Sequence, residues 1–139
     1  MEAKLKHLEF IQGVISRMAT NSFLFKGWAI TIAAGISAFA ALDTKPAVLS
    51  IALISTAMFW GLDGYYLWLE HRFRDLYAKV AATNESAVDF SMKFDKPQPF
   101  RTWVCTCFGR PHLWLFYGAM VAVDIIGIFV IKGAVHHVP

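Results

Sequence analysis

Three charged side chains lie inside long apolar segments of this sequence: Lys26, Asp63 and Asp124. An unpaired Asp at the centre of a bilayer costs about 2.5–3.5 kcal/mol, so such residues usually have a partner or a function. Lys26 and Asp63 lie at similar depths in their segments, and we expect them to form an ion pair. Alternatively, Asp63 reaches the membrane interface, accepts a hydrogen bond from Tyr65 or Tyr66, or takes part in transport or gating.

Asp124 lies near the middle of its apolar segment, where the chain offers no cation at the same depth. Its carboxyl group is therefore protonated, faces water, or accepts a hydrogen bond from a neighbouring helix. The candidate donors are hydroxyl groups on the other two apolar segments: Thr31, Ser37, Ser55 and Thr56. Alternatively, Asp124 carboxylates from several subunits could form a ring around a water-filled lumen, where water hydrates them. Such rings favour cations. Asp124, Asp63 and Lys26 are thus the candidate pore or intramembrane polar residues.

Other residue types give little sign of catalysis or metal binding. Cys105 and Cys107, the only cysteines, have a C-x-C spacing that is tighter than a C-x-x-C metal or redox pair, and we expect two reduced thiols. His136 and His137 match a metal-binding tract only weakly. The sequence has no phosphate-binding Gly loop and no H-E-x-x-H or G-x-S-x-G motif. We therefore expect no enzyme, no cofactor and no metal site.

The composition places the chain in a membrane. Of its 139 residues, 57% are hydrophobic and 17% are charged, against about 25% charged residues in a typical soluble domain. The apolar residues form three segments, 21–42, 46–69 and 112–132, each about as long as a membrane-spanning helix. Buried helices of a soluble bundle are the alternative, but those would carry polar residues at every turn. The predicted fold is an all-α membrane protein with three transmembrane helices.

The basic residues predict the orientation of these helices. Four of the 13 Lys and Arg residues lie in 1–26, seven lie between residues 72 and 110, and only Lys45 and Lys132 remain for the other side. By the positive-inside rule, the N-terminus and the segment 83–111 are cytoplasmic, and the tail 133–139 is periplasmic. The net charge of +3 follows from this asymmetry, so we expect membrane lipids and no nucleic acid as partners.

Two amphipathic segments extend the membrane core. In residues 1–20 apolar residues recur every three or four positions, which predicts an amphipathic helix that lies on the membrane or packs against another helix. The second span is expected to continue as a cytoplasmic helix to about residue 82. Its predicted packing stripe is Ile54, Met58, Leu62, Tyr65, Leu69, Phe73, Leu76 and Val80. The candidate docking surface for a cytoplasmic protein partner is Leu8, Ile11, Ile15, Phe73, Leu76 and Val80.

Small residues recur on the first span at four-residue steps: Ala29, Ala33, Ser37 and Ala41. Small side chains let helices approach closely in lipid, so this stripe predicts a helix contact within or between subunits. Three spans leave no room for an enclosed site, and we expect a homo-oligomer in which a central pore could form. Residues 83–111 are expected to form an irregular connector and then an aromatic stretch along the inner membrane surface, where anionic lipids attract Arg101 and Arg110.

Two stretches, RMATNSFLFKGWAITI and FWGLDGYYLWLEHRFRDLY, resemble a widespread group of small, uncharacterised bacterial membrane proteins. The resemblance covers most of residues 7–80 and implies a bacterial inner-membrane setting. In outline the chain is also similar to the membrane effectors of anti-phage defence systems, which oligomerise and permeabilise the inner membrane. We therefore expect an oligomeric effector or channel that lets ions cross. The alternatives are a membrane-anchored accessory subunit that docks a cytoplasmic partner, and a proton-coupled exporter built around Asp63 or Asp124.

Overall fold

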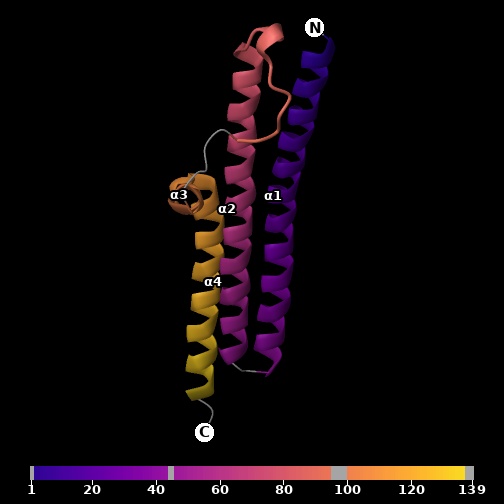
Figure 1. Ribbon diagram of the computed structural model, residues 1–139. Coiled ribbons are helices and arrows are strands. Elements are labelled where there is room, and N and C mark those ends of the chain that lie inside the picture. Colours follow the sequence, from indigo (N-terminus) through magenta and orange to yellow (C-terminus); the bar gives the residue numbers. More distant parts are fainter. Residues whose placement is uncertain (1, 44–45, 95–99, 137–139) are drawn as a thin grey trace.

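The computed structural model describes residues 2–43, 46–94 and 100–136, which are almost entirely helical (Figure 1). The elements, in chain order, are α1 (Glu2–Asp43), α2 (Pro46–Ala82), the short 3₁₀ helix η1 (Glu85–Ala87), α3 (Phe100–Gly109) and α4 (Pro111–His136). Three of these helices are long and apolar enough to cross a membrane, over Glu2–Leu42, Ala47–Ala82 and Pro111–Gly133. The all-helical fold and its three apolar helices are as predicted. Lys45 and His137 lie outside the described residues.

The segments predicted as an amphipathic helix to residue 20 and a span from residue 21 form one continuous helix, α1. No proline interrupts residues 2–43, so the helical hydrogen bonds continue from the amphipathic half into the apolar half. At a rise of 1.5 Å per residue, the 42 residues of α1 extend about 63 Å and the 37 residues of α2 about 55 Å. Both lengths exceed the roughly 30 Å of a hydrocarbon core, so the two helices continue together beyond it.

The helices are arranged around α2. In Figure 1, α2 lies between α1 and α4, and α4 accompanies only the half of α2 that follows Pro46. The short helix α3 lies where α4 begins and contacts both α2 and α4. After η1 the chain turns back along α1 and α2, so residues 88–94 cover part of these helices (Figure 1). The result is a three-helix membrane part and a two-helix extension.

The face of α2 that packs in the membrane part is not the apolar stripe predicted from the sequence. Ile54 and Met58 of that stripe are 70% and 57% exposed. The buried face consists instead of Leu49, Ala52, Thr56, Phe59 and Asp63. In lipid, apolar side chains gain nothing by turning inward, whereas polar groups must be shielded by protein. The small and polar residues Ala52, Thr56 and Asp63 therefore lie at the helix contact together with Leu49 and Phe59, and the apolar stripe faces outward.

Beyond the membrane part, the extension consists of residues 2–20 of α1 and 70–82 of α2, held together by an apolar cluster. Ile11, Ile15 and Val80 are buried at its centre, and Leu8, Phe73, Leu76, Tyr77 and Val88 pack around them. Lys4 Nζ donates to the carbonyl oxygens of Ala81 (2.9 Å) and Thr83 (2.8 Å) and so caps the end of α2. The prediction that the N-terminal helix packs against another helix is confirmed.

This cluster contains all six residues of the predicted docking surface. The six residues assigned to a cytoplasmic partner, Leu8, Ile11, Ile15, Phe73, Leu76 and Val80, pack against one another across α1 and α2. Residues 88–94 add further cover, since Val88 joins the cluster and the Phe94 ring lies 4.9 Å from that of Phe73. The apolar faces of the two segments bury each other, because α1 and α2 lie side by side and antiparallel. The sequence of either segment alone does not show this pairing.

The small-residue face of α1 also differs from the predicted four-residue stripe. Ala29 and Ala33 are buried, Ser37 is half-buried, and Ala41 is exposed, whereas Ala40 is fully buried. At about 100° per residue, eleven residues return to within roughly 20° of the starting direction, whereas twelve residues miss it by roughly 120°. Within the single chain, the contact face therefore runs from Ala29 to Ala40, and Ala41 lies outside it.

Candidate intramembrane polar site

The carboxyl group of Asp63 is the centre of a buried polar cluster between three helices. Its side chain is 0% exposed, and Lys26 Nζ of α1 lies 2.5 Å from Oδ2. Ser22 Oγ, one helical turn before Lys26, donates to Oδ1, and Tyr117 of α4 donates its hydroxyl to Oδ2 at 3.2 Å. Lys26 also donates to Ser22 Oγ at 3.1 Å. Both carboxylate oxygens thus have donors, and the cluster joins α1, α2 and α4.

The predicted ion pair between Lys26 and Asp63 is confirmed, while the additional donors differ from those considered. The tyrosine that donates is Tyr117, not Tyr65 or Tyr66. Ser22 could have been found from the sequence, because it lies four residues before Lys26 and therefore on the same face of the helix. Tyr117 could not, because its place depends on how far α4 is shifted along α2.

The pairing offsets the cost of burying a charged group. An ion pair in a low-dielectric environment stabilises a protein only if the remaining lone pairs and protons are also satisfied. Here the lysine provides the opposite charge, and two hydroxyl groups complete the acceptor sites of Asp63. The site can therefore hold a neutral ion pair within apolar helices, and it links any movement of α1 to α2 and α4.

The cluster continues from Tyr117 to α3 through Trp60. The Trp60 indole stacks on the Tyr117 ring, with centroids 5.9 Å apart and planes inclined by 9°. Its Nε1 donates to the backbone oxygen of Cys107 in α3 at 2.9 Å. In return, Trp103 Nε1 of α3 donates to the backbone oxygen of Gly61 at 3.2 Å. Two indole hydrogen bonds therefore fasten α3 to α2 beside the ion pair.

Close approach of α3 to α2 requires a glycine at position 64. A Cβ atom on Gly64 would lie 2.2 Å from Cys107 Sγ, which is well inside van der Waals contact. Burial raises the pKa of the Cys107 thiol, and the negative charge of Asp63 raises it further. Cys105 is exposed, and both cysteines are free thiols, as expected. Side chains two residues apart on a helix point about 200° apart around its axis. The two cysteines of the C-x-C pair in α3 therefore point in nearly opposite directions.

Asp124 is buried in a second polar layer of the α2–α4 contact. Its side chain is 3% exposed, and Thr56 Oγ1 donates to its Oδ2 at 3.3 Å. Thr56 is one of the four donors proposed from the sequence. On each helix this layer lies seven residues, or about 10 Å, from the layer of Asp63 and Tyr117. Asp124 thus faces α2 and is not on the outer surface of the single chain.

A groove reaches Asp124 from the side of α1. It has a volume of about 400 Å³, lies between α1 and α4, and is lined mostly by small and apolar residues. Ser37 of α1 and Asp124 of α4 supply its polar groups. Of the predicted small-residue stripe, Ala33 and Ser37 therefore border this groove.

Beyond the membrane part, charged side chains form pairs on and beside α2. Glu70, seven residues after Asp63, is buried and pairs with Arg74 at 2.6 Å. Arg110, which immediately precedes α4, forms a hydrogen bond with the His71 ring. Among residues 2–43, 46–94 and 100–136, no three His, Cys, Asp or Glu side chains gather as they would around a metal ion.

Comparison of the chain with protein-family models, with characterised proteins and with solved structures gives no match.

Proposed function

We propose that this chain is a subunit of an oligomeric channel of the bacterial inner membrane, an effector that permeabilises the membrane when the channel opens. One observation carries the proposal: the groove between α1 and α4 is lined by small and apolar residues except for Ser37 and the buried Asp124. Ionisable residues within membrane helices commonly mark ion pathways. Several subunits that turn this groove toward a common axis would line a lumen with carboxyl groups, which favour cations.

The Asp63 cluster supports a gating role in this proposal. It ties α1, α2 and α4 together, and Trp60 links it to α3. A trigger that displaces α3 or spreads the extension would act on the same cluster. In this account the structure is the closed state, because Asp63 and Asp124 have protein partners and little exposure.

The orientation and the biological setting are part of the proposal. The extension and α3 are placed in the cytoplasm by the distribution of Lys and Arg. A role in anti-phage defence is proposed from the outline resemblance alone. The alternative of an accessory subunit loses support, because the six residues assigned to docking pack within the chain.

The experiment that tests the channel is ion efflux from proteoliposomes loaded with potassium, with the subunit number measured on the same preparation. We compare Asp124→Asn with Asp75→Asn, which removes an exposed carboxylate from the extension of α2. Wild type and Asp75→Asn should be oligomeric and release potassium at the same rate, whereas Asp124→Asn should release it at a different rate. A monomeric protein, or equal efflux from all three variants, would refute the proposal.

A further inference from the structure

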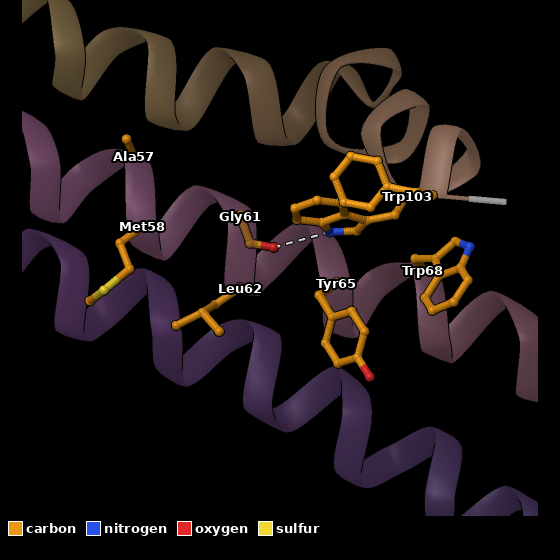
Figure 2. A pocket seen from close by; sticks show the side chains of 8 residues that line it. Ala57, Met58, Gly61, Leu62, Tyr65, Trp68 and Trp103 are labelled. Atoms are coloured by element: carbon orange, nitrogen blue, oxygen red, sulfur yellow. Dashed lines mark hydrogen bonds between the residues drawn. The ribbon is translucent and has the colours of Figure 1, made fainter.

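A second groove, distinct from that at Asp124, lies between α2 and α3 (Figure 2). It has a volume of about 570 Å³. One wall is the outward face of α2 from Ala57 to Trp68, and the other is formed by Phe100 and Trp103 of α3. The only hydrogen bond drawn across it joins Trp103 Nε1 to the Gly61 carbonyl, so both groups are already paired (Figure 2). Apart from the Tyr65 hydroxyl and Trp68 Nε1, a buried donor without a hydrogen-bond partner among the described residues, the remaining lining is apolar, which suits a hydrocarbon ligand with a polar end.

The length of this groove matches one leaflet of a bilayer. The eleven steps from Ala57 to Trp68 correspond to about 16 Å along the helix axis. A hydrocarbon core about 30 Å thick gives about 15 Å per leaflet. Because α2 is one of the apolar helices, the groove would lie along the direction of the acyl chains.

Positive charge is found at one end of the groove. The Arg72 guanidinium lies 5.0 Å from the centre of the Trp68 ring and 3.8 Å from that of the Phe94 ring. Arg101 is exposed and follows Phe100 in the first turn of α3. The other end, at Ala57 and Met58, is apolar and is followed by the apolar half of α2. The groove is therefore apolar at one end and positively charged at the other, which is complementary to an anionic phospholipid.

We propose that this groove is a binding site for one anionic phospholipid. One acyl chain lies between α2 and α3, and the phosphate lies near Arg72 and Arg101. Bound lipid would pack on the aromatic side chains that face it from both helices and would stabilise α3 on α2. This inference does not depend on whether the protein conducts ions.

Native mass spectrometry of the full chain in detergent tests the site. The protein is equilibrated with equal amounts of phosphatidylglycerol and phosphatidylcholine that have the same acyl chains. Wild type should retain one phosphatidylglycerol per subunit in preference to phosphatidylcholine. Arg101→Gln should lower that preference by about fivefold, the factor that corresponds to about 1 kcal/mol for one arginine near an anionic headgroup. Arg17→Gln, an exposed arginine of α1, is the matched control and should leave the preference unchanged.

A second pair of variants tests the location of the acyl chain. Ala57→Phe fills the apolar end of the groove and should abolish retention of either lipid, whereas Ala122→Phe, on an exposed face of α4, should not. Met58→Trp narrows the same end of the groove and should also abolish lipid retention. It replaces Ala57→Phe in the test if that variant does not fold. Equal binding of both lipids by wild type, or full retention in the folded groove variants, would overturn the proposal. So would a loss of subunits from the oligomer with lipid binding intact, because the groove would then be a subunit contact.

Discussion

Removal of Lys26 should destabilise the protein far more than removal of an exposed lysine. The variant Lys26→Met deletes the cation that faces the fully buried Asp63 and keeps a side chain of similar length. Lys6→Met is the matched control, because Lys6 pairs with Glu2 at 2.9 Å while their side chains are 65% and 84% exposed. The two variants thus break one buried and one exposed ion pair by the same substitution.

The expected size of the effect follows from the surroundings of each pair. Loss of one partner from a buried ion pair costs about 3–5 kcal/mol, because it leaves an uncompensated charge. Ser22 and Tyr117 still donate to Asp63, so we expect the lower end, about 3 kcal/mol. An exposed pair contributes about 0–1 kcal/mol. The difference of at least about 2 kcal/mol corresponds to a factor of roughly 30 in the unfolding equilibrium.

The assay is reversible unfolding in mixed micelles of dodecyl maltoside and sodium dodecyl sulfate, followed by tryptophan fluorescence and circular dichroism. The double variant Lys26→Met with Asp63→Asn should regain much of the loss, because the amide oxygen still accepts from Tyr117 and carries no charge. If Lys26→Met is as stable as Lys6→Met, or if the double variant is the least stable, the buried pair is not what holds the three helices together.

Three further predictions concern the attachment of α3 and the extension. Gly64→Ala should loosen α3, because the added Cβ would collide with Cys107 Sγ. Gly61→Ala is the control, because its added Cβ would lie at an ordinary 3.7 Å from Trp103. Maleimide should label Cys107 faster in Gly64→Ala and at the wild-type rate in Gly61→Ala. In single-cysteine variants at neutral pH, exposed Cys105 should react readily and Cys107 slowly. Because burial and Asp63 raise the pKa of Cys107, its labelling rate should rise only above the usual thiol pKa of about 8.5. Equal pH profiles for Cys105 and Cys107 would contradict the buried position of Cys107 beside Asp63. Ile11→Ala removes a fully buried side chain and should lower the free energy of unfolding by about 2–5 kcal/mol in the micelle assay; an unchanged midpoint would contradict the packing of α1 on α2.

The sequence was sufficient to predict the three long apolar helices, because their apolar length is a local property, whereas the short helix α3 was not predicted. It placed the end of the second helix near residue 82, where Ala82 ends α2. The continuity of α1 could also have been predicted, because no helix-breaking residue separates its two halves. The packed face of α2 could not be predicted from its apolar stripe, since such a stripe marks the buried side of a helix in water but the outer side in lipid.

Contacts across helices were predictable only where charge restricted the choice. Lys26 was the one cation near the depth of Asp63, so the pair could be assigned. Asp124 had four candidate hydroxyl partners, and only the register of α4 against α2 selects Thr56. The same register places Tyr117 at Asp63 and Trp60 against Tyr117. Such a register results from packing along the whole contact, and no local motif records it.

The most direct test of the proposed channel is the reversal potential in a planar bilayer under a potassium chloride gradient, for wild type and Asp124→Asn. If Asp124 lines the lumen, wild-type channels should reverse toward the potassium equilibrium potential, and Asp124→Asn should shift the reversal toward zero, because a ring of carboxylates favours cations. Identical reversal potentials, or the absence of discrete conductance from an oligomeric preparation, would contradict a channel lined at Asp124.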